Sequence, residues 1–162
     1  MPKFKQADVD YLVKARKFIY RTIEDNSDWA RKHPLTEAPN ELRIRYEIRR
    51  KDNPHEDIRL QFYARKEMES PLAKWGTSLL WHGERIRGID HKLREDRIYG
   101  GLIVGFIRHW HEHIWTDEDR DRNIIDVNSV IKNEDKRSII ELCMDRWNIE
   151  GYGVQYRLEP KK

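Results

Sequence analysis

Three histidines alternate with other residues along one short segment of the chain. His109, His111 and His113 fall in the run Arg-His-Trp-His-Glu-His-Ile. In a β-strand, side chains two positions apart lie on the same face, at a spacing of roughly 6.5–7 Å. Three imidazoles on one face are unusual for a core, because histidine is polar and protonated rings repel one another. This segment is therefore the candidate functional site.

Two kinds of chemistry suit this pattern, and a solvent-exposed strand without chemistry is the third interpretation. Histidines two apart on a strand can ligate one divalent transition metal, with a further ligand from the third histidine, Asp90 or His91. Alternatively, His109 and His111 can exchange protons as base and acid in the transesterification of RNA, which needs no metal cofactor. The spacing alone does not choose among the three.

Other residues are candidates for supporting roles. Asp90 ends the run Gly-Ile-Asp before a charged segment, and it can orient an imidazole if its strand pairs with the histidine strand. In the ribonuclease hypothesis, His113 or Asp90 orients the reacting pair, while Arg87 and Arg108 hold phosphate. Arg43, Arg45 and Tyr63 belong to alternating runs whose arginine-rich face can follow a nucleic-acid backbone. An exposed sheet face accounts for these arginines equally well.

The spacing of apolar residues predicts the elements that position these groups. Helical spacing from Ala7 to about Glu24 predicts an amphipathic N-terminal helix, and strict alternation over 42–49 and 58–65 predicts a β-hairpin. A second hairpin is expected from Trp75 to Asp90, with its turn at His-Gly-Glu.

The second half of the chain continues the sheet and ends in a helix. The charged residues 91–101 predict a loop, 102–115 a long strand carrying the histidines, and 124–127 a short strand. A helix capped by Asn133 and an extended segment over 154–158 complete the chain.

Because strands follow one another without crossover helices, the predicted fold class is α+β. We expect an antiparallel sheet of about five strands with an N-terminal amphipathic helix and a C-terminal helix. The chain is expected to be a single domain over residues 1–162. Residues 1–40 would form an N-terminal helical appendage, and 41–158 the antiparallel sheet with its C-terminal helix.

Composition excludes several classes of protein. The single cysteine cannot form an intramolecular disulfide, and no segment has the ~18 apolar residues of a membrane helix. The first residues lack an apolar signal core, so a cytoplasmic location is expected and no membrane partner. The first 66 residues carry 16 Lys and Arg against 11 Asp and Glu, a basic balance that suits a polyanionic partner or a solvated surface.

Residues 56–149 resemble a group of small prokaryotic proteins that includes the TumE-like toxins of toxin–antitoxin pairs. The likeness lies in Gly83–His91, in His109–His113 and in the predicted helix around Ile139–Trp147. In those toxins a turn similar to Gly-x-Asp-x precedes the His-x-His strand by a few residues, whereas 18 residues separate Asp90 from His109 here. The resemblance implies a growth-inhibiting protein that acts on RNA and is neutralised by an antitoxin protein.

The sequence thus predicts a toxin-like, RNA-acting protein, with a metal-independent ribonuclease as the leading hypothesis. The first alternative is a metal-binding protein that uses His109, His111 and His113. The second is a non-catalytic interaction module of a phage or defence system.

Overall fold

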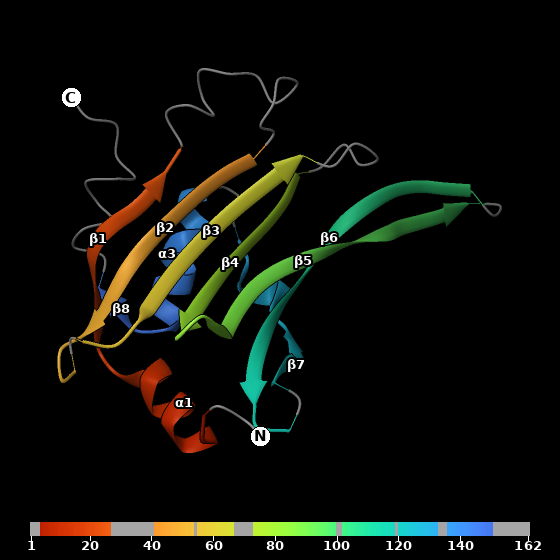
Figure 1. The fold of residues 1–162 in the computed structure, drawn as a ribbon. Coiled ribbons are helices and arrows are strands. Elements are labelled where there is room, and N and C mark those ends of the chain that lie inside the picture. The colour runs from red at the N-terminus through yellow and green to blue at the C-terminus, as the bar shows by residue number, and fades with distance from the viewer. Residues whose placement is uncertain are drawn as a thin grey trace.

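The protein folds as an α+β structure in which one large sheet carries two helices (Figure 1). The structure is a computed structural model that describes residues 4–26, 41–53, 55–66, 73–99, 102–118, 120–132 and 136–150. The helices are α1 (Gln6–Lys14), the 3-10 turn η1 (Asn128–Val130) and α3 (Lys136–Arg146). The strands are β1 (Lys17–Asp25), β2 (Glu41–Arg50), β3 (Ile58–Lys66), β4 (Ala73–Trp81), β5 (Glu84–Tyr99), β6 (Leu102–Thr116), β7 (Arg120–Asp126) and β8 (Ile149–Glu150).

The sheet is larger than predicted and it is mixed. Eight strands are ordered β7-β6-β5-β4-β3-β2-β1-β8, in place of about five antiparallel strands. Successive strands from β1 to β7 pair antiparallel, and β8 pairs parallel with β1. The parallel pair arises because α3 crosses over the sheet before the chain reaches β8, and a crossover is what parallel pairing requires. The two predicted hairpins are confirmed as β2–β3 and β4–β5.

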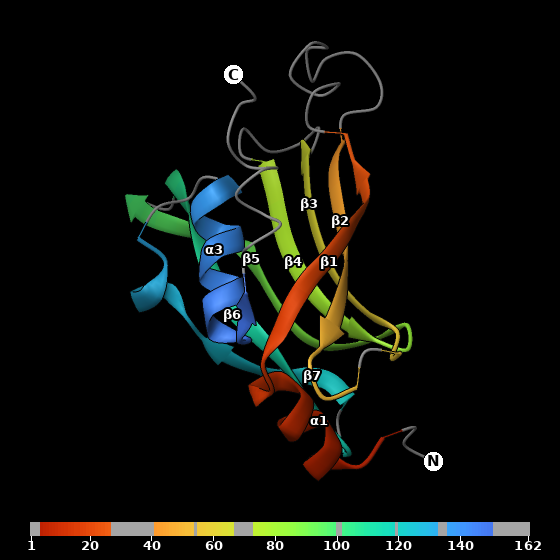
Figure 2. The same ribbon diagram turned by 90° about the vertical axis from the view of Figure 1, so that its left-hand side faces the viewer.

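One face of the sheet packs on α3 to form the core (Figure 2). Period-2 alternation places the apolar residues of the central strands on this face and the arginines on the other. The core side chains of β2, β3 and β4 are Ile44, Tyr46, Ile48, Ile58, Leu60, Phe62, Leu79 and Trp81. Helix α3 contributes Ile139, Ile140, Cys143 and Met144. Hence the outer face of the sheet is left for polar groups.

The predicted N-terminal helix ends early. Helix α1 stops at Lys14, and the second half of the predicted helix is instead strand β1. The buried ammonium of Lys17 explains the break, because it donates to the carbonyl oxygens of Leu12, Val13 and Ala15 at 2.7, 2.9 and 2.6 Å. These contacts satisfy orphan carbonyls at the helix end. The segment that follows is rich in aromatic and β-branched residues, which favour a strand. The region predicted as an appendage therefore supplies a strand of the main sheet.

The predicted loop over 91–101 is also wrong, because β5 continues to Tyr99 and β6 begins at Leu102. The two strands form one long hairpin that extends beyond the rest of the sheet in Figure 1. Strand β4 pairs with β5 as far as Asp90, and β7 pairs with β6 as far as His111. The Asp90–His111 pair thus lies where the hairpin leaves the sheet.

Two further predicted elements are present in the structure, and two others lie outside the residues it describes. The predicted strand at 124–127 corresponds to β7, and the predicted C-terminal helix to α3. The Asn133 cap and the extended segment over 154–158 lie outside the described residues. In the part of the chain that the structure describes, no helix has the length and apolar character needed to cross a membrane.

Candidate functional site

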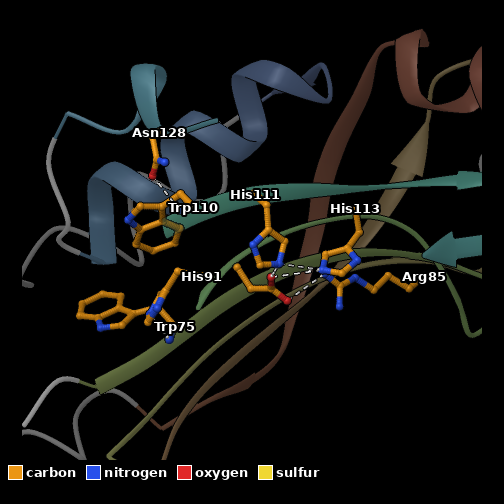
Figure 3. A network of polar contacts seen from close by, with 8 residues as sticks. Trp75, Arg85, His91, Trp110, His111, His113 and Asn128 are labelled. Carbon is orange, nitrogen blue, oxygen red and sulfur yellow. Dashed lines mark hydrogen bonds and ion pairs between the residues drawn. The ribbon is translucent and has the colours of Figure 1, made fainter. Parts of the chain in front are cut away.

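Asp90, His111 and His113 converge at one point on the outer face of the β5–β6 pair. The Nε2 atoms of the two histidines lie 3.1 Å apart. Both approach the same carboxylate oxygen of Asp90, with His113 Nε2 at 3.2 Å and His111 Nε2 in closer contact. Figure 3 shows the two rings turned toward one another, with Arg85 beside them. The three donor atoms therefore surround one small volume.

Strand register explains the convergence. Asp90 is the Cα partner of His111, and His113 follows two residues later on the same face of β6. Paired residues on neighbouring strands share a face, with Cα atoms about 5 Å apart. The 18 residues between Asp90 and His109 include the paired arms of β5 and β6, so the sequence gap does not separate the groups in space. The predicted proximity of Asp90 to the histidines is confirmed, because its carboxylate contacts both His111 and His113.

The distances suit ligation of one metal ion. Asp90, His111 and His113 form a group of potential ligands whose donor atoms all lie within 4.8 Å of one another. Two donors bound at about 2.1 Å to a common ion lie roughly 3.0–3.4 Å apart for octahedral to tetrahedral angles. The His111–His113 and His113–Asp90 distances of 3.1 and 3.2 Å fall within this range, and the contact between His111 Nε2 and Asp90 Oδ1 is shorter than it. The arrangement provides two imidazoles and one carboxylate, and three protein ligands leave at least one coordination position for water or a substrate.

The three potential ligands differ in solvent exposure, and the group is accessible from one side. The exposed fractions of the side chains are 5% for His111, 15% for Asp90 and 21% for His113. An ion held here would be shielded on the His111 side and reachable past His113. Low solvent exposure also strengthens the electrostatic interactions of the site.

Arg85 completes the surroundings of Asp90. Its Nη2 atom lies 3.2 Å from Oδ2, while the two histidines contact Oδ1. The guanidinium thus fixes the carboxylate orientation and leaves Oδ1 for the imidazoles or for an ion. Such partners of a ligating group orient it and tune its affinity for metal. No local sequence pattern marks Arg85 as a member of the site.

The other histidines named as candidates lie elsewhere. His109 is directed to Asp126 of β7, at 3.4 Å from its carboxylate, and it is not a member of the converging group. His91 is buried on the core face, where its Nε2 accepts the backbone N–H of Trp75 and its ring packs against Trp110. Neither residue shares the site of Asp90. The three histidines of the motif therefore divide into a pair and a neighbour.

The arginines predicted to hold phosphate are not both brought to this face. Arg87 projects to the core face, where burial is the main cause that lowers its pKa and Glu112 and Asp10 are the nearby anions. It is placed on the opposite side of the sheet from the His111–His113 pair. Arg108 belongs to β6, and its side chain lies outside those that the structure describes.

Arg43, Arg45 and Tyr63 share the outer face with the ligand group. One transverse row runs from strand to strand through Arg43, Tyr63, Gly76, Asp90 and His111. The adjacent row runs through Arg45, Gln61, Ser78, Gly88 and His113. The ring of Tyr63 covers Gly76, since a methyl group there would lie 2.6 Å from the ring. The predicted arginine-rich face is therefore continuous with the site.

Comparisons with known protein families, with curated proteins and with solved structures found no match. The geometry therefore carries the functional argument for this chain. The resemblance to TumE-like toxins rests on the short motifs alone and stays a prediction.

The single cysteine has no part in the site. Burial raises the pKa of Cys143 to about 12, so the thiol stays protonated at neutral pH. A protonated, fully buried thiol is a poor nucleophile and a poor metal ligand. Cys143 packs in the core, as its position on the apolar side of the C-terminal helix predicts.

Proposed function

We propose that the protein binds one divalent transition metal ion through Asp90, His111 and His113 and uses it to hydrolyse RNA. The observation that carries the proposal is the convergence of three donor atoms within 4.8 Å, two of them imidazole nitrogens. Imidazole and carboxylate ligands suit zinc, iron, nickel, cobalt and manganese. This proposal places the metal hypothesis ahead of the metal-independent ribonuclease, and it assigns the ligand role to two of the three histidines.

The separation of the imidazoles favours a metal over a metal-free proton relay. In transesterification, the base and the acid work on different oxygens of the phosphate and stand on different sides of it. The predicted pair of His109 and His111 is divided, because His109 is directed to Asp126. The Nε2 atoms of His111 and His113 are 3.1 Å apart and approach the same carboxylate oxygen of Asp90, which leaves no room for a phosphate between them. An ion held by Asp90, His111 and His113 would instead lower the pKa of a water ligand toward about 7 and so supply a hydroxide for attack on phosphorus.

RNA as the substrate is supported by the surface around the site. Arg43, Arg45 and Tyr63 lie on the transverse rows that lead to Asp90 and His113. Arginines attract a phosphate backbone, and an aromatic ring stacks on an unpaired base. A single-stranded segment crossing the strands would pass from these side chains to the metal ligands. A toxin role with a protein antitoxin as partner is part of the same proposal.

The test is cleavage of a labelled single-stranded RNA by untagged protein, before and after chelation. We expect cleavage to stop on removal of metal, to return with one of zinc, manganese, cobalt, nickel or iron, and to be lost in His111→Ala. The matched control is His109→Ala, which changes a histidine of the same motif outside the ligand group.

The outcomes separate the hypotheses. Cleavage that persists without metal and is lost in His109→Ala would favour the proton relay predicted from the motif. Metal binding without cleavage of any RNA would contradict the hydrolase and leave a metal-binding protein. Growth arrest on expression, absent in His111→Ala, would support the toxin role.

A further inference from the structure

Arg85 reaches the outer face of the sheet because of a β-bulge. Leu79 pairs with Arg87 and Leu80 pairs with Arg85, so β5 has one extra residue, Ile86, at this point. Positions 85 and 88 would face opposite sides of a regular strand, since their separation is odd. The bulge places Arg85 on the same side as Gly88. Bulges of this kind redirect side chains next to functional sites.

Gly88 supplies the space in which the guanidinium lies. A methyl group at Gly88 would stand 2.1 Å from both Nε and Nη2 of Arg85. The guanidinium is therefore seated directly on the backbone of β5, between the Gly88 position and Asp90. A residue with a side chain at position 88 would force the guanidinium, which is the end of a flexible side chain, out of this position.

The hydrogen bonding of Arg85 is incomplete. Its Nη2 donates to Asp90 at 3.2 Å, while its Nε is buried and has no hydrogen-bond partner within the described part of the chain. A buried N–H without a partner destabilises the fold, so it calls for an explanation, and a ligand that accepts its hydrogen bond is one. The side chain as a whole is 25% exposed, which leaves it accessible to a ligand.

We propose that Arg85 is the anion-binding residue of the site and holds a non-bridging oxygen of the substrate phosphate through Nε and Nη2. The inference rests on the proposed function, because it places the phosphate between Arg85 and an ion on Asp90. The planar guanidinium presents both N–H donors to a phosphate in a fixed geometry, which a lysine cannot reproduce. When Asp90 ligates a cation, its charge is shared with that cation, so its hold on Arg85 weakens and the guanidinium turns to the phosphate.

Arg85 fits this role better than the other arginines of the face. Asp90 contacts Arg85 and the two histidines. Arg59 lies on the same transverse row as Arg85, two strands away, and pairs with Asp57 at 3.2 Å. It therefore serves as a matched control on the same face.

The experiment measures inorganic phosphate binding to the cobalt-loaded protein by calorimetry and by the visible spectrum of the ion. We expect phosphate to bind the unmodified protein and to bind roughly tenfold or more weakly in Arg85→Lys, which keeps the charge but loses Nε. Gly88→Ala displaces the guanidinium without changing any charge, so it should weaken phosphate binding similarly. Arg59→Lys should bind phosphate as the unmodified protein does. Cobalt affinity and far-ultraviolet circular dichroism are measured for each variant.

Phosphate affinity that is unchanged in both Arg85→Lys and Gly88→Ala would overturn the inference, and so would equal losses in Arg59→Lys. If no metal binds, the proposed function fails separately, and phosphate is titrated into the metal-free protein. Binding there that depends on Arg85 supports the anion site, and its absence overturns it.

Discussion

Two carboxylates, Glu112, which is buried, and Asp90, which is partly buried, occupy opposite faces of the same strand pair and are bound in different ways. Glu112 of β6 faces the core, where Arg146 Nε donates to one oxygen at 3.0 Å and Trp147 Nε1 to the other at 2.8 Å. Asp90 of β5 faces outward, where its oxygens meet Arg85 and two imidazoles. In the sequence, Glu112 lies between His111 and His113, the two histidines proposed as metal ligands.

The chemistry of the donors separates a structural group from a functional one. Both partners of Glu112 carry fixed protons and no lone pair that can bind a metal, so its network is closed. The partners of Asp90 include two imidazoles that either donate a proton or ligate an ion. We infer that Glu112 anchors β6 to α3 and that this anchoring holds His111 and His113 in place on the other face.

The largest expected effect is on stability, from Glu112→Ala. Removing this carboxylate leaves the indole N–H of Trp147 buried without an acceptor and Arg146 without its anion. We expect a loss of about 3 kcal/mol in the free energy of unfolding, measured by urea denaturation. A loss below about 1 kcal/mol would contradict the structural role of Glu112.

Metal binding to Asp90, His111 and His113, on the face opposite Glu112, should raise the free energy of unfolding. An ion present at 100 times its dissociation constant adds roughly 2.7 kcal/mol, which raises the melting temperature by about 5–10 °C for a chain of this size. We expect this shift in the unmodified protein and in His109→Ala, and none in His113→Ala. An equal shift in His113→Ala would mean that the ion binds elsewhere.

Lys17, like Glu112, is a buried charged group whose partners leave no place for a metal. Its ammonium donates to three backbone carbonyl oxygens. Burial, with a smaller contribution from the charge of Arg50, lowers the pKa of Lys17 from 10.5 to about 7. Between these values the unfolded chain holds a proton at Lys17 that the folded chain lacks, so stability rises with pH. The slope is at most about 1.4 kcal/mol per pH unit.

The measurement is urea denaturation from pH 7 to 9 of the unmodified protein and of Lys17→Met. Taking the difference between the two cancels the titration of groups that they share, such as Tyr11 and Cys143. The unmodified protein should gain stability relative to Lys17→Met as pH rises. A difference that stays constant over this range would show that the folded chain keeps Lys17 charged.

The smallest effect is expected from Arg59→Ala, which removes an ion pair on the outer face. Arg59 and Asp57 are each nearly half exposed, and exposed pairs contribute about 0.2–1 kcal/mol. We expect a change of about 0.5 kcal/mol or less in urea denaturation. A loss comparable to that of Glu112→Ala would remove the distinction between exposed and closed networks.

Secondary structure was predicted correctly where apolar and polar residues alternate strictly, and incorrectly where this alternation is interrupted. The strands from Leu42 to Arg65 followed from period-2 alternation alone. The apolar residues from Lys17 to Glu24 also fit a helical spacing, which predicts a helix. The pairing with β2 that makes this segment a strand is a long-range effect, which local spacing does not reveal. The charge of residues 91–101 predicts a loop, but a two-stranded hairpin accommodates charged residues on either face.

The site was predicted in location and in part in composition. The His-x-His spacing identified His111 and His113, and the Gly-Ile-Asp run identified Asp90. His109 shares the spacing, but its neighbour across β7 is Asp126, a pairing that no local pattern reveals. No local pattern marks Arg85, because in a regular strand it would share a face with Arg87, and only the bulge at Ile86 places the two arginines on opposite sides of the sheet. A glycine three residues after an arginine occurs too often in sequences to indicate that Arg85 belongs to the site.

The most direct test of the metal site is the stoichiometry of binding to chelator-treated, untagged protein, by calorimetry and elemental analysis. We predict one ion of zinc, cobalt, nickel, iron or manganese per chain, with affinity reduced at least about 100-fold in His111→Ala and little changed in His109→Ala. Absence of binding by all five metals, or binding that is unaffected by His111→Ala, would contradict the account.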